Sequence, residues 1–305
     1  MRFGPESKLA GKTIEEIKDL IKAAGGIFPA SRILSVSHST IYNRLNVAGI
    51  TLDDIMMEYQ REIAPAIIDN DKLTGDYIIS ADYHSPFISM LWLNRLLNVA
   101  KKENIKQLVI GGDFGDIDRL SWWLRQKQAE DIAVKLDDEL AFTEMVLEKL
   151  FEWFERIDII GGNHWLRLLG AVTFSVSAKR LMGLVGQKDN PKLHFHGLFN
   201  WLLIDSKVRV THPAKARKLD YTLARDLSIL HPDQWIVVTH RHRASEAFTP
   251  DGRPIMEIGW MGDVERMRYI RYTDSTYYNW VNSFGVYKDG VMRNLTEYNY
   301  SWDDK

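Results

Sequence analysis

Residues 77–84 read YIISADYH, a run of apolar residues that ends directly in Asp82 and His84. A short apolar run that stops at polar residues predicts a buried strand. The same texture returns in residues 107–116, QLVIGGDFGD, and in residues 157–164, IDIIGGNH. Because segments with helical spacing separate these runs, the sequence predicts an α/β domain with strands and helices in alternation.

The segments around these runs complete the predicted domain. Pro86 is expected to begin a helix, because proline is tolerated at the first helical position. Residues 136–154 place apolar side chains on one helical face. The C-terminal part is richer in strands, and Asp289-Gly290 is typical of a hairpin turn. These strands are predicted over residues 193–196, 201–204, 208–211, 235–239 and 255–258.

Polar side chains with metal-binding chemistry follow the predicted strands at the point where each one ends. In open α/β sheets, ligands bind at the carboxyl ends of the strands, so one edge can gather all of them. Carboxylate, amide and imidazole groups suit Mn, Fe, Zn or Mg better than a thiophilic metal. Two metals about 3.5–4 Å apart need a carboxylate that bridges them. The candidates are Asp82, His84, Asp113, Asn163, His164, His212, His240 and His242.

Composition narrows the classes of protein further. The chain has 305 residues, nine histidines and no cysteine, which excludes disulfides, Cys-ligated metal centres and a thiol nucleophile. A formal net charge of −2 gives no sign of a surface dominated by nucleic-acid binding, although a local basic patch is compatible with it. No transmembrane or secretory segment is visible. We therefore expect a cytoplasmic protein without a membrane partner.

The first 60 residues read as a separate helical module. Thr13 and Glu16 form a capping-box pattern at the start of the first helix. A short helix over 30–34, a turn and a third helix over 39–45 resemble a helix-turn-helix motif. The predicted organisation is a helix-turn-helix-like module over 1–62, a linker over 63–75 and the α/β domain over 76–305.

Two interpretations of this module remain open. An exposed helix face with Ser39, Tyr42, Asn43 and Arg44 is a candidate DNA contact. Residues 1–60 contain seven basic and seven acidic side chains, which weakens that interpretation because phosphate contacts dominate DNA affinity. The alternative is a structural cap or an oligomerisation element.

The chemistry-bearing segments form five blocks in a fixed order, each after a predicted strand. The order is D-x-H, GD-x-x-D, GNH, a lone histidine and H-x-H, here Asp82-Tyr83-His84, Gly112-Asp113-Phe114-Gly115-Asp116, Gly162-Asn163-His164, His212 and His240-Arg241-His242. This order resembles the calcineurin-like metallophosphoesterase family. The layout is similar to phage-encoded members with an N-terminal helix-turn-helix segment. The resemblance implies a four-layer αββα sandwich, with two mixed sheets flanked by helices.

The resemblance also implies a dinuclear metal site and the role of each residue in it. Manganese is the expected metal, with Fe, Zn, Mg and Ni as alternatives, and a metal-bound hydroxide would attack the phosphoester. His164 would face the substrate as general acid, and Asp116 would orient it. The implied ligands are Asp82, His84 and His242 for one ion, Asn163, His212 and His240 for the other, and Asp113 as the bridge.

The sequence departs from the family pattern at three positions. Trp165 stands where Asp or Glu is common, and Thr239 replaces the glycine before His240. Ile117 stands where phosphoprotein phosphatases have a phosphate-binding arginine, which argues against a protein phosphatase. Other cations that can bind the phosphate are Arg119, Arg241, Arg243 and Lys215.

Three functions are compatible with these observations. The missing arginine and the helix-turn-helix-like module favour a phosphodiesterase, with a nucleic acid or a nucleotide as substrate and partner. The first alternative is a phosphomonoesterase or a cyclic-nucleotide phosphodiesterase that acts on a small molecule. The second is a DNA-binding regulator with an inactive phosphoesterase domain, which the intact ligand set disfavours. No sequence feature indicates an oligomeric state.

Overall fold

The chain divides into two compact units, Met1–Ile68 and Asp69–Lys305, and each is described by itself. None of the described helices is both long and apolar enough to span a membrane. The structure is a computed structural model that describes residues 9, 11–63, 72–121, 133–167, 183–187, 189–198, 200–214, 221–267 and 279–302.

The N-terminal unit contains four described helices around one small core. Thr13 caps the first helix, and its backbone N–H donates to the Glu16 carboxylate at 2.7 Å, which confirms the capping box. The core includes Ile17, Ile41 and Leu45, all of them buried. The helices are α1 (Ile14–Ala24), α2 (Ile27–Leu34), α3 (His38–Val47) and α4 (Leu52–Ile63).

Helix α2 begins earlier than the sequence predicts. It starts at Ile27 rather than Ala30, and Gly26 serves as the N-cap. Pro29 fits in the first turn because the backbone N–H groups there have no partner within the helix, so the missing N–H of proline costs no hydrogen bond. Helix α3 likewise extends two residues beyond the predicted Leu45, to Val47.

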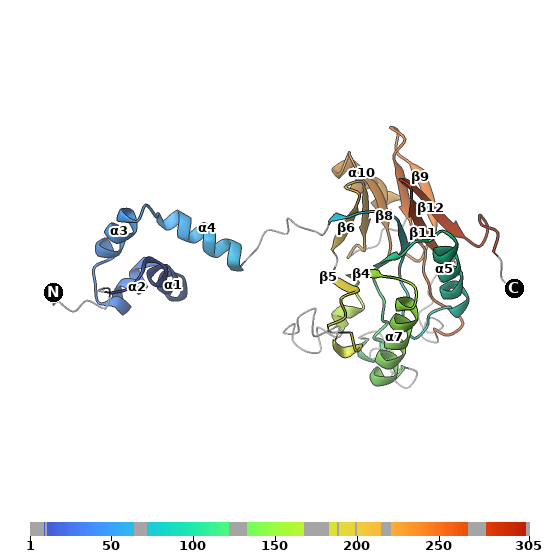
Figure 1. Cartoon of the computed structure of the whole chain (residues 1–305), viewed down its shortest axis with the longest axis horizontal. Coiled ribbons are helices and arrows are strands. Elements are labelled where there is room, and N and C mark those ends of the chain that lie inside the picture. The colour runs from blue at the N-terminus through green and yellow to red at the C-terminus, as the bar shows by residue number, and fades with distance from the viewer. Residues whose placement is uncertain are drawn as a thin grey trace. The chain divides into compact units, whose positions relative to one another are not determined.

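The second unit is built on two six-stranded mixed sheets (Figure 1). In the first sheet, β2 to β5 are parallel, and β11 and β12 join them as an antiparallel hairpin that turns at Asp289-Gly290 as predicted. Its order is β12 (Val291–Thr296), β11 (Ser283–Lys288), β2 (Tyr77–Ser80), β3 (Gln107–Gly111), β4 (Arg156–Gly161) and β5 (Leu193–Leu198).

The second sheet comes mainly from the later part of the chain. Strands β7, β8 and β10 are parallel, and β9 pairs antiparallel to β10 at one edge. At the other edge, Lys72 and Leu73 form β1, although the sequence predicts a linker there. The order is β1 (Lys72–Leu73), β6 (Trp201–Ile204), β7 (Val208–Thr211), β8 (Trp235–Val238), β10 (Pro254–Glu257) and β9 (Ser245–Phe248).

Alternating side chains sort the strands into layers. Tyr77 and Ile79 lie in the core between the two sheets, whereas Ile78 packs with the helices on the outer face. Those helices are α5 (Met90–Lys102) and α7 (Leu136–Phe151). On the outer face of the second sheet lies α10 (Thr222–Leu230), whose Ala224 packs against strand residues. The four-layer αββα sandwich is therefore confirmed (Figure 1).

The predicted start of α5 is wrong. The helix begins at Met90 with Ser89 as its N-cap, not at Pro86. The preceding residues are held elsewhere, because Ile88 forms an isolated bridge with Gly262 and the Phe87 N–H donates to the His84 carbonyl at 2.7 Å. This turn directly follows a candidate metal ligand, so tertiary contacts override the local helical preference.

Candidate metal centre

The carboxyl ends of five strands bring the predicted ligand residues together. Strands β2, β3 and β4 of one sheet and β7 and β8 of the other all end at the same edge. Hydrogen bonds join the two sheets there, including one from the His240 N–H to Asp82 Oδ2 at 2.9 Å. Three groups of described residues have ligand atoms that all lie within 4.8 Å of one another: Asp82–His84–His242, Asp113–His212–His240 and His84–Asp116–His164.

The first group brings three metal-ligand atoms close together. His84 donates from Nδ1 to Asp116 Oδ1 at 2.7 Å, so its Nε2 carries a lone pair. That Nε2 lies 3.0 Å from His242 Nε2, which in turn lies 3.8 Å from Asp82 Oδ1. Asp82 Oδ1 is buried and has no hydrogen-bond partner among the described residues. A cation between these three atoms would satisfy all of them.

The second group repeats this arrangement. His212 Nδ1 donates to the carbonyl oxygen of Gly111 at 2.9 Å, which turns Nε2 toward the centre of the group. Nε2 lies 3.2 Å from Asn163 Oδ1 and 3.4 Å from Asp113 Oδ2. His240 Nδ1 lies 3.9 Å from the same Asp113 oxygen and is buried without a hydrogen-bond partner among the described residues. This donor set also fits a cation.

Strained backbone accompanies both groups. Non-glycine residues with positive φ are uncommon, and each costs of order 1–3 kcal/mol unless the surroundings enforce it. Such strain concentrates at functional sites, which agrees with a site that fixes the direction of each ligand. The residues concerned are Asp82 (φ 53°), His84 (φ 46°), Asp113 (φ 40°), His240 (φ 85°) and His242 (φ 58°).

Two glycines allow the close approach of the strand ends. A Cβ atom at Gly162 would lie 2.1 Å from Asp113 Oδ1, and one at Gly112 would lie 1.9 Å from the His212 ring. Thr239, which directly precedes His240, is buried and donates its hydroxyl to the Gly111 carbonyl. It therefore ties β8 to β3 directly behind the ligands.

His164 and Asp116 lie beside the two groups. His164 Nδ1 lies 2.9 Å from Asp116 Oδ1 and 2.8 Å from the Asp116 carbonyl oxygen. The same carboxylate oxygen accepts from His84, so Asp116 fixes the rings of both histidines. His164 Nε2 points toward Asp113, with 3.8 Å to Oδ2.

Arg167, which lies outside the five sequence blocks, also contacts His164. Its Nη1 donates to the Asp116 carbonyl at 2.7 Å, and its Nη2 lies 3.3 Å from His164 Nε2. The signal that could have found it is its position three residues after His164, in the same turn. Trp165, between them, is fully buried in the core.

Charges inside the cluster shift the pKa values strongly. Burial alone would raise the pKa of Asp113, but the charges of His164 and His212 outweigh it and lower that pKa well below its usual range. Burial would lower the pKa of His212, yet Asp113 raises it to about 9. Burial, reinforced by the neighbouring His84, lowers the pKa of His242 well below its ordinary value. The cluster therefore attracts positive charge at the Asp113 side and keeps a neutral imidazole at the Asp82 side.

The predicted phosphate-binding cations have different surroundings. Arg241 is only 9% exposed, and its guanidinium pairs with Glu257 at 3.1 Å, so it supports the strand end instead of facing solvent. Arg119 is exposed in a short 3₁₀ helix (Asp118–Leu120), and Arg243 is half-buried. Lys215 lies outside the described residues.

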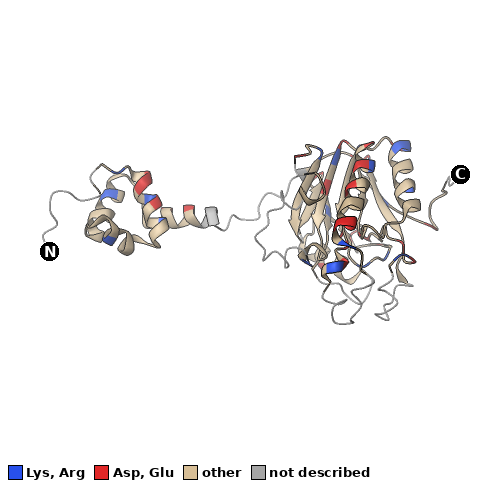
Figure 2. Ribbon diagram, turned by 90° about the horizontal axis from the view of Figure 1, so that it is seen from below, with Lys and Arg blue, Asp and Glu red and all other residues tan. Residues whose placement is uncertain are grey.

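The candidate DNA contacts lie on α3. Ser39 and Asn43 are exposed and Tyr42 is half-buried. Arg44 instead donates to the carbonyl oxygens of Leu9 and Lys12, which lie just before α1. Figure 2 shows both signs of charge on the helices of this unit. Contact with DNA through α3 therefore remains a prediction that rests mainly on uncharged side chains.

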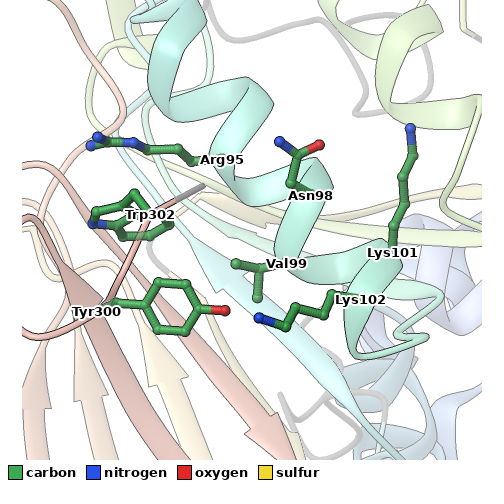
Figure 3. A pocket seen from close by; sticks show the side chains of 7 residues that line it. All are labelled: Arg95, Asn98, Val99, Lys101, Lys102, Tyr300 and Trp302. Carbon is green, nitrogen blue, oxygen red and sulfur yellow. The ribbon is translucent and has the colours of Figure 1, made fainter. Parts of the chain in front are cut away.

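A cavity of about 310 Å³ lies away from the metal centre, at the C-terminal half of α5 (Figure 3). The Tyr300 hydroxyl and the Lys102 ammonium group point toward each other across it. The opposite end of α5 is the one next to the metal centre. There the Ser89 N–H donates to the Met261 carbonyl, and the Met261 N–H donates to the Asp82 carbonyl. The lining residues are Arg95, Asn98, Val99, Lys101, Lys102, Tyr300 and Trp302, and none of them belongs to the metal centre.

Comparison with known proteins identifies structural neighbours only. No protein-family model and no curated protein sequence matches this chain. The phosphoesterase YfcE from E. coli is 15% identical, with a TM-score of 0.39, over 74% of this chain and 95% of that one. Vacuolar Protein Sorting 29 from Cryptosporidium parvum is 11% identical, with a TM-score of 0.38, over 73% and 98%. The nuclease MPE from Pseudomonas putida is 12% identical, with a TM-score of 0.34, over 72% and 87%.

A buried carboxyl group behind the centre gives a pH-dependent stability. Glu139 accepts the Ile117 N–H, and burial, reinforced by the charge of Asp116, raises the pKa of its carboxyl to about 9. The unfolded chain loses this proton near pH 4.5, so stability should fall as the pH rises from about 4.5 to about 9. Glu139→Gln mimics the protonated acid. We expect it to reduce the slope of unfolding free energy against pH by about 1.4 kcal/mol per pH unit.

Urea unfolding of metal-free protein at pH 5, 7 and 8.5 measures this slope. Glu148→Gln, at an exposed position of the same helix, is the matched control and should leave the slope unchanged. Parallel stability curves for wild type and Glu139→Gln would show that Glu139 is ionised in the folded protein.

Proposed function

We propose that this chain is a dinuclear metal-dependent phosphoesterase that hydrolyses a phosphodiester in a nucleic acid or a nucleotide. One observation carries the proposal. Two sets of ligand atoms, Asp82–His84–His242 and Asp113–His212–His240, lie at the carboxyl edge of two sheets, with the Asp113 carboxylate 3.4 Å from His212 and 3.8 Å from His164. Paired cation sites of this composition are typical of two-metal hydrolytic centres.

Each cation site has its own ligands. Asp82, His84 and His242 would hold one divalent ion, with manganese as the first choice. Asn163, His212 and His240 would hold the other, and Asp113 would bridge the two. When bound, such a pair neutralises the phosphate oxygens and activates a water for in-line attack.

His164 and Asp116 would serve the leaving group. Because Asp116 fixes Nδ1 of His164, the ring presents Nε2 toward Asp113, 3.8 Å from its Oδ2. Nε2 can then hand a proton to the departing ester oxygen or stabilise its charge. Asp116 acts as the positioning residue in this proposal.

Two features favour a diester in a nucleic acid. Ile117 is buried beside Asp116, at the position where the protein phosphatases of the resembled family have an arginine. The N-terminal unit presents a helix-turn-helix-like pair, α2 and α3, with Ser39 and Asn43 exposed. The unit would guide the catalytic domain to its substrate.

A substrate panel tests the proposal with the full-length chain. With Mn²⁺, bis-p-nitrophenyl phosphate should turn over at least tenfold faster than p-nitrophenyl phosphate, and single- or double-stranded DNA should be degraded. Preference for the monoester would favour a phosphomonoesterase. Absence of turnover for every phosphoester, across Mn²⁺, Fe²⁺, Zn²⁺, Mg²⁺ and Ni²⁺, would contradict the proposal.

A further inference from the structure

Arg167 lies beside His164 with a partly exposed side chain. Its side chain is 20% exposed, although one N–H donates to the buried Asp116 carbonyl at 2.7 Å. Among the described residues, its carboxylate contact is long, at 3.8 Å from Nη1 to Asp116 Oδ2. That carboxylate also accepts hydrogen bonds from His84 and His164. The guanidinium is therefore anchored by the Asp116 carbonyl without a short ion pair to a described residue.

Arg167 lies directly against the His164 ring. Its Nη2, which offers only donors, lies 3.3 Å from His164 Nε2. Nδ1 of the same ring faces two oxygens of Asp116 and therefore carries a proton. The guanidinium thus lies against Nε2, the atom through which His164 would contact a substrate.

A guanidinium is well suited to phosphate because it offers several N–H donors in one plane. The Asp116 carbonyl already holds one edge of the Arg167 guanidinium. Because the side chain is ordered in advance, binding a ligand at the other edge costs little conformational entropy. Arg241, the alternative in the H-x-H block, forms an ion pair with Glu257 through its guanidinium.

We propose that Arg167 binds a non-bridging oxygen of the scissile phosphate and so holds the phosphate beside Nε2 of His164. This inference rests on the proposed phosphoesterase function. It assigns the phosphate contact that neither Ile117 nor Arg241 provides, and it places that contact on the segment after β4.

The variants Arg167→Ala and Arg167→Lys, in the full-length metal-loaded protein, test the assignment. Loss of a charge-assisted hydrogen bond predicts that Arg167→Ala raises KM for the diester and weakens binding of inorganic phosphate by about ten- to a hundredfold. Arg167→Lys should recover part of the phosphate affinity. Arg225→Ala, on an exposed arginine of α10, is the control and should match wild type.

Three measurements keep the outcomes distinct. Isothermal titration with inorganic phosphate reports binding without turnover, metal analysis shows whether both ions are retained, and thermal melting reports folding. Phosphate affinity and KM equal to wild type in Arg167→Ala would overturn the assignment. If wild type binds phosphate through Arg167 but hydrolyses no phosphoester, the proposed function fails while the Arg167 site stands. If Arg167→Ala misfolds, the test rests on Arg167→Lys, and wild-type phosphate affinity and KM in that variant would support a contact that any cation can make. Unfolding of both variants would overturn the ligand role.

Discussion

Asp113→Asn is expected to lower kcat by about three orders of magnitude, which corresponds to about 4 kcal/mol in the activation barrier. Asp113 Oδ1 accepts the His164 N–H at 3.0 Å, whereas Oδ2 faces His212 and His240. Asparagine keeps the first contact and the side-chain volume, but it replaces the second oxygen by an NH₂ group. An NH₂ group cannot bridge two cations, so the bound metal should fall from two ions per chain to one or none.

Steady-state kinetics and metal analysis by mass spectrometry measure the two effects together. Asp138→Asn, an exposed residue in the first turn of α7, is the matched control and should keep both metals and full activity. Full activity with two metals in Asp113→Asn would contradict a bridging role for this carboxylate.

His164→Ala is expected to lower kcat by about 10²- to 10⁴-fold, the range that general acid catalysis contributes. Metal content should remain at two ions per chain, because His164 lies outside both proposed ligand sets. The loss should depend on the leaving group. A nitrophenolate departs without a proton, so bis-p-nitrophenyl phosphate should be affected least, and a diester with an alkyl leaving group most.

His231→Ala is the control for this variant, since His231 lies in a loop after α10, outside the cluster. Equal losses for aryl and alkyl leaving groups would argue that His164 contributes to binding rather than to proton transfer. Loss of a metal ion in His164→Ala would instead make it a ligand.

The sequence predicts the fold well because its strand signals are local and strong. Apolar runs of strand length, each stopped by Asp, Asn or His, identify β2, β3 and β4 and the edge at which they end. Lys72 and Leu73 escape detection because a two-residue strand exists only through its pairing with β6. The start of α5 is missed for a similar reason, since Ile88 pairs with Gly262 from far along the chain.

Within the candidate centre, residue types could be predicted and their directions could not. The five blocks select every residue of the three groups that the structure assembles. The left-handed backbone at Asp82 or His240 has no sequence signal, because it depends on contacts between the two sheets. Arg167 lies outside the five blocks, and only the folded structure shows that its guanidinium contacts His164. Arg241 lies inside a block, yet burial and Glu257 take its charge.

The position of bound metal tests the central claim most directly. Crystals grown with Mn²⁺ would be measured at a wavelength where manganese scatters anomalously. We predict two anomalous peaks about 3.5–4 Å apart. One should lie among Asp82, His84 and His242, and the other among Asn163, His212 and His240, with Asp113 between them. A single peak, or peaks away from these side chains, would contradict the account.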